Sequence, residues 1–327
     1  MCTYNGGLYL LEQLESLAVQ TRLPDEVVVC DDMSSDETRD IVQAFAAVAP
    51  FPVSLHVNET NLGSTKNFEK AIELCDGDVI ALSDQDDVWL PKKLQQTVRL
   101  LAADAEVGAV FTDAEVVDAN LKPLGYRLWS AAKFDQGKQR LVREGKGVDL
   151  LINDNYATGS TMVFRAKYKE LLLPIPYLKD CIHDGWIALV IAAVSRLEFI
   201  AEPLMLYRQH PGQQIGAKQD CEPADVRENN RENTLDSLLA ATTRQTSFDR
   251  DIHKCRLVVE RLTEKSGSFD CRNALAKVKS KLIHFETRDS LPSERLKRLP
   301  RVLRELLTLR YHSYSLGFKS AAKDLFL

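Results

Sequence analysis

The sequence lacks a long apolar run, a leader segment and a strong net charge. No stretch approaches the ~18 consecutive apolar residues that cross a bilayer. The first residues carry neither the basic region nor the apolar region of a signal peptide. The formal net charge is −5, so no overall positive charge attracts nucleic acid. We therefore expect a cytoplasmic protein with no nucleic-acid partner.

Paired cysteines are also missing. The seven cysteines lie far apart and form no C-x-x-C pair, which is typical of buried or free thiols in a reducing compartment and not of a disulfide framework. Hydrophobic residues make up 45% of the chain and charged residues 27%, as in an ordinary globular protein. A length of 327 residues accommodates one large domain or two smaller ones.

An acidic loop is the most informative feature that is present. The apolar run 79–82 predicts a buried strand, and Pro91 fits the first turn of the helix that follows. Asp84, Asp86 and Asp87 therefore follow the carboxyl end of a strand, where open α/β sheets bind ligands. Such crowded carboxylates must be protonated in part or share a cation. Because Mg²⁺ commonly takes one or two carboxylates plus substrate phosphates, the loop predicts a metal–diphosphate site, with a solvated acidic loop as the alternative.

Strand and helix patterns alternate at short intervals through the first two thirds of the chain. We expect strands at 26–30, 53–57, 79–82, 107–111, 162–164, 197–200 and 204–207, and helices at 8–20, 34–48, 64–74, 91–103, 166–174 and 187–194. This alternation predicts an α/β fold with a mostly parallel sheet flanked by helices.

Polar residues recur where these strands end. Asp31 and Asp32 follow one strand, the acidic loop follows another, and Asp113 follows a third. Recurrence at one edge of a sheet favours a single ligand site over separate solvated loops. The segment 126–146 has a weak pattern, so we expect a mobile segment over that site.

The chain changes character after about residue 218. No strand pattern remains, and helical patterns run through 235–239, 252–262 and 275–282. We therefore expect one domain at 1–219 and an α-helical region at 220–327. Basic residues gather in 291–327, for which two interpretations stay open. The helices pack on the first domain through their leucines, or the part from Arg295 to Arg310 forms a cationic amphipathic face on anionic lipid.

Several of these stretches, taken in order, resemble glycosyltransferase family 2, inverting enzymes with a GT-A fold. The resemblance spans about residues 1–217, and it is carried by Cys2–Gly6, Val29–Thr38, Asn61–Gly63 with Asn67, Asp84–Asp87, Thr158–Gly159, His183–Trp186 and Tyr207–His210. Each stretch alone is weak, whereas the ordered set is specific. The sequence is most similar to bacterial rhamnosyltransferase-like members that build surface polysaccharide.

The resemblance implies a set of donor-binding residues. They correspond to Thr3, Asn5, Asp31, Asp32, Asn61, Gly63, Lys66, Asp84 and Arg208. Either Asp31 or Asp32 accepts from the nucleobase or holds the ribose, and the sequence leaves the choice open. An Arg is common in the family at the position of Lys66, which keeps the charge without the bidentate fork.

The resemblance also implies a metal, Mg²⁺ or Mn²⁺. Asp86 matches its ligand, Asp84 points to the ribose or to metal-bound water, and His210 is either a metal or phosphate contact or a structural loop histidine. Arg208 and His210 are expected on a loop that closes on the donor.

Asp184 matches the catalytic base of the family, which takes the proton of the acceptor hydroxyl. Burial beside Trp186 would raise the pKa of Asp184 toward the working pH. The alternative is that Asp184 only caps the following helix. Thr158, Gly159, His183 and Trp186 are expected on the acceptor side of the site.

The implied function is the transfer of a sugar, rhamnose or another hexose, from a nucleotide diphosphate to a saccharide or lipid-linked acceptor. By resemblance dTDP-rhamnose is the first expectation for the donor, with UDP- and GDP-sugars as alternatives. A sugar-phosphate nucleotidyltransferase would need a Gly- and Arg-rich loop where this chain has Cys2–Gly6, and a phosphatase with an Asp nucleophile would leave Asp31 and Asn61 unexplained. An inactive sugar-nucleotide-binding protein is the remaining alternative.

Family members have an apolar strand immediately before the stretch that matches Cys2–Gly6. A missing inner strand leaves backbone groups unpaired. We therefore expect that extending the amino terminus of this chain by an apolar strand raises both the melting temperature and the turnover. Equal melting temperatures and equal turnover of the two forms would contradict this expectation.

Overall fold

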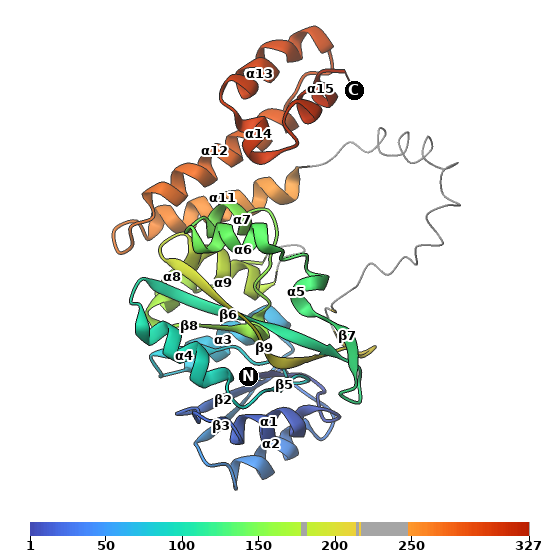
Figure 1. Ribbon diagram of the computed structural model, residues 1–327, viewed down its shortest axis with the longest axis vertical. Helices are drawn as coiled ribbons and strands as arrows, with labels where there is room; N and C mark the ends of the chain where they lie inside the picture. The colour runs from blue at the N-terminus through green and yellow to red at the C-terminus, as the bar shows by residue number, and fades with distance from the viewer. Residues whose placement is uncertain (178–181, 214–215, 217–247, 327) are drawn as a thin grey trace, which may run out of the picture. The chain divides into compact units, whose positions relative to one another are not determined.

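The computed structural model describes residues 1–177, 182–213, 216 and 248–326 (Figure 1). The chain divides into two compact units, Met1–Gln219 and Asp220–Leu327. The first unit contains all the strands among the described residues, and the described part of the second unit is helical.

The first unit begins with a three-stranded parallel sheet. Its order is β1-β2-β3, with bounds β1 (Cys2–Thr3), β2 (Val27–Asp31) and β3 (Val53–Val57). The strands are joined and followed by α1 (Leu10–Ala18), α2 (Thr38–Ala46) and α3 (Ser64–Leu74). Leu10, Leu14 and Leu17 are buried on one side of α1, whereas Leu8 and Leu11, which share the same helical spacing in the sequence, are exposed.

The second sheet has six strands. Its order is β4-β8-β6-β9-β5, with β7 paired to β6. The bounds are β4 (Val79–Ala81), β5 (Val88–Trp89), β6 (Val107–Val117), β7 (Pro123–Arg127), β8 (Met162–Arg165) and β9 (Arg196–Arg208). β6 and β9 are parallel, whereas the other pairs are antiparallel. The expected parallel order thus applies to the first sheet and to the centre of the second.

Two strands are longer than the sequence pattern predicts. The expected strands at 197–200 and 204–207 form the single strand β9, and β6 continues beyond Asp113. Register shifts between β6 and β9 on both sides of Asp113 let the two strands continue past an irregular point. Asp113 Oδ1 accepts from the backbone N–H groups of Ala114 at 2.8 Å and Trp129 at 3.0 Å, so its carboxylate is a structural acceptor inside the sheet.

The segment 126–146 is regular and packed, contrary to the expected mobile segment. It contains α5 (Leu128–Ala131) and α6 (Gln136–Arg143). Trp129 and Phe134 are buried with ring centroids 4.9 Å apart. Phe111 and Phe199 complete this aromatic cluster. The burial of these rings fixes the segment, which the weak helical periodicity does not reveal.

Helices cover the second sheet. They are α4 (Lys93–Ala103), α7 (Gly147–Leu151), α8 (Lys169–Leu172) and α9 (His183–Ala192). All residues of α9 from His183 to Ile191 are buried, which explains why its sequence is apolar on every side. Its first turn therefore enters the interior of the unit.

The described part of the second unit consists of five helices. They are α11 (Asp249–Glu264), α12 (Arg272–Asp289), α13 (Arg295–Leu307), α14 (Arg310–Tyr314) and α15 (Phe318–Phe326). The expected pattern at 235–239 lies outside the described residues. No helix in the described ranges has the length and apolarity to cross a membrane.

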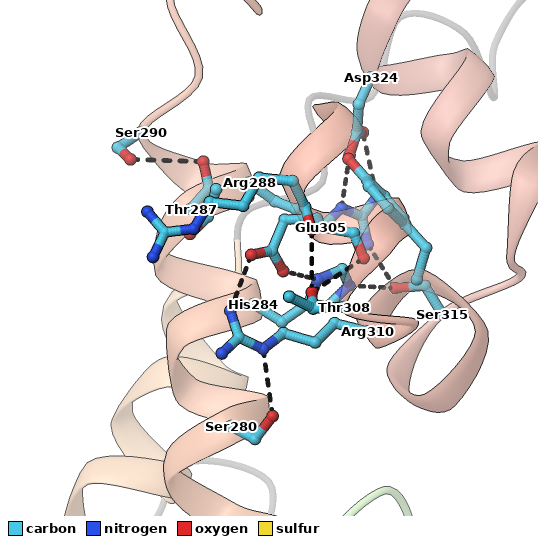
Figure 2. A network of polar contacts seen from close by, with 12 residues as sticks. Ser280, His284, Thr287, Arg288, Ser290, Glu305, Thr308, Arg310, Ser315 and Asp324 are labelled. Atoms are coloured by element: carbon cyan, nitrogen blue, oxygen red, sulfur yellow. Dashed lines mark hydrogen bonds and ion pairs between the residues drawn. The ribbon is translucent and has the colours of Figure 1, made fainter. Parts of the chain in front are cut away.

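A buried polar network holds α12, α13 and α14 together (Figure 2). His284 is fully buried, and its two ring nitrogens lie 2.7 Å from Glu305 Oε2 and 2.9 Å from Ser315 Oγ. Arg288 makes a two-point ion pair with Asp324, with distances of 2.6 and 3.0 Å. Charged hydrogen bonds thus supply part of the cohesion that a larger apolar core would otherwise give.

We predict that replacing Gly108 of β6 with Ala destabilises the first unit. A Cβ atom there would lie 2.0 Å from Ser195 Oγ and 2.7 Å from Ile191 Cγ2, so α9 and β6 could not keep their spacing. The expected loss is about 1–3 kcal/mol of unfolding free energy, measured by urea denaturation. Gly77→Ala is the matched control, because its Cβ would meet only Val79 O at 3.6 Å. Equal midpoints for the two variants would contradict the prediction.

Candidate active site

The loops after β1 and β2 are joined through Asp31. Thr3 Oγ1 donates to Asp31 Oδ1 at 3.0 Å, and the backbone N–H of Ser34 donates to Asp31 Oδ2 at 2.9 Å. The backbone N–H of Asn5 donates to Ser34 Oγ at 2.8 Å, while Asn5 Oδ1 accepts from Ser35 N at 2.8 Å. Asp31 is fully buried, and its hydrogen bonds hold the loop after β1 and the loop after β2 together.

Asp32 organises a third loop. Its carboxylate accepts from the backbone N–H groups of Leu62 at 2.7 Å and Gly63 at 2.8 Å, and from Asn58 Nδ2 at 2.8 Å. Asn61 Nδ2 donates to the backbone oxygen of Asp32 at 3.2 Å. The sequence reasoning assigned Asp31 or Asp32 to the nucleotide. In the structure both carboxylates hold protein donors, and the loops that they fix are the surfaces left for a ligand.

Lys66 lies on α3 and bridges two parts of the fold. Its Nζ lies 2.7 Å from Glu69 Oε2 and donates to Ile175 O at 2.8 Å. Glu69 Oε2 also accepts from the backbone N–H of Ile175 at 2.5 Å. These contacts hold the ammonium group of Lys66 within the protein. To contact a sugar-nucleotide donor, the side chain would have to change its conformation.

Gln85 fastens the acidic loop to the loop after β1. Its side-chain amide accepts from Tyr4 N at 2.8 Å and donates to Tyr4 O at 3.1 Å. The side chain thus forms the two hydrogen bonds that a neighbouring β-strand would form with Tyr4. A Cβ atom at Gly6 would lie 2.2 Å from Gln85 Oε1, so glycine is needed there for this close approach. The motif spacing places Gln85 between two aspartates, where it serves to hold them against β1.

The carboxylates of the acidic loop affect each other strongly. Burial raises the pKa of Asp84 to about 7, and the charges of Asp86 and Asp184 add to the effect. Burial, then Asp86 and Asp84, also raise the pKa of Asp87 well above its usual range. Asp87 Oδ1 accepts from the backbone N–H of Arg208 at 3.1 Å and the Ser160 hydroxyl lowers the pKa of Asp87, whereas its buried Oδ2 makes no hydrogen bond of ordinary geometry among the described residues. The site thus concentrates more negative charge than its protein donors compensate.

Lys93, which the sequence reasoning missed, is a buried cation beside these carboxylates. Its side chain is fully buried, with Nζ donating to Ser160 O and lying 3.7 Å from the centre of the Trp89 ring. Burial lowers the pKa of Lys93 well below its usual range, while Asp87 and Asp84 act in the opposite direction. The only sign of Lys93 in the sequence is its position in the first helical turn after the acidic loop. Because lysines on helices are normally exposed, this position does not predict a buried lysine.

Arg208 has a different position from the expected one. Its guanidinium donates to the backbone oxygens of Asp86 and Ala119, each at 2.6 Å, and forms an ion pair with Glu12. It also lies over the Tyr9 ring at 4.5 Å, and the side chain is 1% exposed. Three of its five N–H groups are thus used inside the protein, where they fix the acidic loop, and the expected donor contact of Arg208 stays a prediction.

His210 and Asp86 form a direct pair. His210 Nε2 lies 2.8 Å from Asp86 Oδ2, and the backbone N–H of Gly212 donates to Nδ1 at 3.2 Å. Because Nδ1 accepts, Nε2 carries the hydrogen that Asp86 receives. No three His, Cys, Asp or Glu side chains in the described ranges are arranged to hold a metal ion on their own.

The donor set nevertheless fits a cation that takes most of its ligands from a substrate. Asp86 offers a carboxylate oxygen, and Asp84 interacts with Asp86 through its charge. Nε2 of His210, which lies against Asp86, could serve as a ligand only without its hydrogen. Mg²⁺ and similar ions often bind through one or two carboxylates, with phosphate oxygens and water completing the shell.

Asp184 lies in the first turn of α9 and is 6% exposed. Its Oδ2 accepts from Gly159 N at 3.1 Å and its Oδ1 from Gly185 N at 2.6 Å. Burial raises its pKa to about 6, against the hydrogen bonds that lower it. The N-cap position of α9 is Ile182 and no side-chain cap hydrogen bond is formed, so Asp184 is not the helix cap that the alternative expects. The charge of Asp184 also contributes to the raised pKa of Asp84, although the two residues are about a hundred positions apart in the chain.

The four residues expected on the acceptor side have distinct positions. Gly159 lies directly against His183, since a Cβ atom there would be 3.1 Å from its Nε2, and Thr158 O accepts from Thr161 N at 3.0 Å. His183 is stacked on Phe68 at 3.9 Å, and burial lowers its pKa to about 3, so it is neutral.

Trp186 is 1% exposed, and its indole N–H donates to Leu172 O at 3.0 Å. It packs α9 against α8 and has no surface for an acceptor. Its expected place on the acceptor side is therefore corrected to a packing role.

Comparisons with known proteins agree with this arrangement. The family described as glycosyl transferase family 2 matches residues 1–171. An uncharacterized glycosyltransferase of Nostoc sp. is 27% identical over 208 residues, which cover 63% of this chain and 62% of that protein. The dTDP-rhamnosyl transferase RfbG of Shigella flexneri is 26% identical over 231 residues, which cover 66% of this chain and 74% of RfbG.

Among solved structures, residues 1–349 of TarS from S. aureus, in complex with UDP-GlcNAc, superpose with a TM-score of 0.56 at 16% identity. The superposition covers 99% of this chain and 86% of that one, and at this identity it concerns the fold. The matched residues 1–171 contain β1, β2, the acidic loop and Gly159, which build most of the site described above. With the family matched over more than half of its length, the chain belongs to glycosyltransferase family 2 and has the GT-A fold.

Proposed function

We propose that the protein is an inverting glycosyltransferase that moves a hexose from a nucleotide diphosphate to a saccharide or lipid-linked acceptor in the synthesis of a cell-surface polysaccharide. The observation that carries the proposal is the meeting of Asp184 with the acidic loop. A carboxylate with a raised pKa lies beside a second group of carboxylates that suits a diphosphate and its cation.

In the proposed reaction Asp184 is the general base. Its carboxylate takes the proton of an acceptor hydroxyl as that oxygen forms a bond to the anomeric carbon. The bond between this carbon and the diphosphate oxygen breaks on the opposite face, and the nucleoside diphosphate leaves with the electron pair. Hydrogen bonds from Gly159 N and Gly185 N fix the carboxylate for this step.

The donor half of the site is built from the loops after β1, β2 and β4. Thr3, Asn5 and the loop 61–63 are the proposed surroundings of the nucleotide, held by Asp31 and Asp32. Asp86, with Asp84 and His210, would hold Mg²⁺ or Mn²⁺. When bound, such an ion offsets the negative charge that develops on the leaving diphosphate. Arg208 and Lys93 keep the carboxylates in place.

dTDP-rhamnose is the proposed donor, because the similarity to RfbG of Shigella flexneri extends over 66% of this chain. UDP- and GDP-sugars are the alternatives. Thermal shift of the protein with each donor in the presence of Mn²⁺ separates them, since at equal concentration the donor with the lower Kd raises the melting temperature more, through a stabilisation of RT ln(1 + [L]/Kd).

Donor hydrolysis with and without Mg²⁺ or Mn²⁺ tests the proposed function, using the wild type, Asp86→Ala and Asp184→Ala. The expected products are free sugar and a nucleoside diphosphate. Release of pyrophosphate from a nucleoside triphosphate and a sugar phosphate would instead indicate a nucleotidyltransferase. Full activity in both variants, or activity that does not depend on metal, would refute the mechanism.

We predict that Asp184→Asn lowers sugar transfer by at least about 100-fold, as expected for loss of a general base. The pKa of Asp184 is raised to about 6, and the base acts unprotonated. In the wild type kcat/KM should therefore rise about tenfold per pH unit below pH 6 and level off above it. Asp25→Asn is the control, because that side chain is 88% exposed and far from any proposed substrate contact. A flat acid limb in the wild type would count against Asp184 as the base.

A second prediction concerns stability and follows from the pKa of Asp84, which is raised to about 7 in the folded protein. A raised carboxyl pKa contributes stability below the unfolded pKa, and this contribution is lost as the pH rises through the folded pKa. The metal-free wild type should thus lose stability between about pH 4 and pH 7 more steeply than Asp84→Asn, by at most about 1.4 kcal/mol per pH unit, and the two slopes should converge above pH 7.

Differential scanning calorimetry at several pH values measures this difference. Added Mn²⁺ should raise the melting temperature of the wild type and flatten its pH dependence, because a cation replaces the proton as the partner of the carboxylates. Parallel pH curves for the wild type and Asp84→Asn would show that Asp84 is an ordinary surface carboxyl.

A further inference from the structure

Helix α13 exposes a row of leucines. The exposed fractions of Leu296, Leu299, Leu303 and Leu307 are 87%, 41%, 47% and 84%. At about 3.6 residues per turn, these positions fall on one narrow stripe of the helix, and the buried Val302 faces elsewhere. A helix of a globular protein normally turns its apolar stripe to the core, so a solvent-facing stripe marks a surface that binds something. We call these four residues the leucine stripe.

Positive charge surrounds the leucine stripe. Residues 291–310 contain six basic side chains and two acidic ones. Glu294 is paired with Lys297 at 2.6 Å. Glu305 is 2% exposed and lies between His284 at 2.7 Å and Arg310 at 2.9 Å, as Figure 2 shows. Neither acid therefore neutralises the remaining arginines of α13.

A cavity of about 230 Å³ opens beside this helix. Arg301, Arg304 and Arg310 line it together with Thr287 and Ser290. Arg301 gives one N–H to Ser290 O at 2.6 Å and keeps its other donors, while the side chain of Arg304 has no hydrogen-bonding partner among the described residues. Guanidinium groups with unused N–H donors match the oxygens of a phosphate.

Arg304 connects the cavity with the leucine stripe. It lines the cavity, follows Leu303 directly and lies three residues before Leu307, within one turn of α13. One surface of the helix therefore offers apolar side chains beside phosphate-binding donors. This combination is the chemistry of a helix that lies in the interface of an anionic membrane.

The buried polar network beneath this surface is structural. Ser315, His284 and Glu305 have the order of a hydrolytic triad, but Ser315 Oγ also accepts from Arg288 at 2.8 Å, and Glu305 is shared with Arg310. The serine oxygen is thus engaged as an acceptor and unsuited to attack a substrate. The network fixes α13 so that the leucine stripe faces outward as a rigid element.

We propose that α13 docks the helical unit on a bilayer rich in anionic phospholipid. The leucine stripe enters the boundary between headgroups and acyl chains, and Arg301, Arg304 and Arg310 hold lipid phosphate in the cavity. The proposal commits to a lipid surface because the charge around the stripe is positive, which an anionic bilayer complements. It does not depend on which sugar the first unit transfers.

Vesicle flotation of the full chain tests the proposal. The probes are vesicles of phosphatidylcholine alone and of phosphatidylcholine with about one third phosphatidylglycerol, at low and high salt. The wild type should float with the anionic vesicles at low salt, and less at high salt, since screening weakens the charge contribution. Leu303→Glu/Leu307→Glu and Arg301→Gln/Arg304→Gln should each reduce the bound fraction about tenfold or more.

Matched controls keep the outcome clear. Leu8→Glu changes an equally exposed leucine (77%) of the first unit, and Arg22→Gln changes an exposed arginine there; both should float like the wild type. Circular dichroism and donor hydrolysis should be unchanged in the variants of α13, which separates this result from failure of the proposed function.

Three results would overturn the proposal. The first is no flotation of the wild type with anionic vesicles at low salt. The second is equal binding to the neutral vesicles, which would remove the role of phosphate. The third is a dimer in light scattering that Leu303→Glu/Leu307→Glu abolishes while flotation is absent, which would identify a second copy of the chain as the occupant of the stripe.

Discussion

Repulsion among the carboxylates of the acidic loop is the constraint on which the site depends. Asp84, Asp86 and Asp87 lie within four residues, and the pKa values of Asp84 and Asp87 are raised. Such a loop keeps one conformation only if other groups hold it. Arg208 donates to its backbone, Gln85 bonds to Tyr4, and Lys93 lies buried beside it, where burial lowers the pKa of the lysine and Asp87 and Asp84 act in the opposite direction.

The same constraint explains why two cations near the site face the protein. A guanidinium that gives three of its five N–H groups to protein oxygens has two left for a diphosphate, and the ammonium group of Lys93 is buried. Their charge still lowers the energy of the carboxylates that remain for a ligand. Some carboxylate oxygens, such as Oδ2 of Asp87, make no hydrogen bond of ordinary geometry among the described residues. A cation or a proton would balance the negative charge of these carboxylates. The conformation of the acidic loop is thus fixed before a ligand binds, while its negative charge is not fully balanced by the protein. A site that binds a charged ligand needs both properties.

Buried polar contacts also hold the described part of the second unit together, where the apolar cluster is small. Its helices carry many charges, and a network centred on His284, Glu305 and Arg288 supplements a small apolar cluster around Val302 and Tyr311. Because this network fixes α13 from one side, the four residues of the leucine stripe are not needed for the core. They are left on the surface, where their hydration is unfavourable unless a partner covers them.

The sequence by itself determined the order of most elements and the identity of the acidic loop. Period and turn signals place β3 and α3 at their observed residues and β2 within one residue of them, because the patterns of these segments are local. The family resemblance, carried by the same stretches, is confirmed by the match over residues 1–171. Local pattern, however, joined neither the two halves of β9 nor the aromatic cluster that orders 126–146, since both depend on partners distant in the chain.

Only the tertiary structure decided what each charged side chain does. Arg208 and His210 are two residues apart and looked alike as donor contacts, yet Arg208 is enclosed by Asp86 O, Ala119 O and Glu12, while His210 pairs with the carboxylate of Asp86. Lys93 looked like an ordinary helix lysine and is buried. The physical reason is that the role of a charge depends on its burial and its partners, and both are set by segments that meet only in the folded chain.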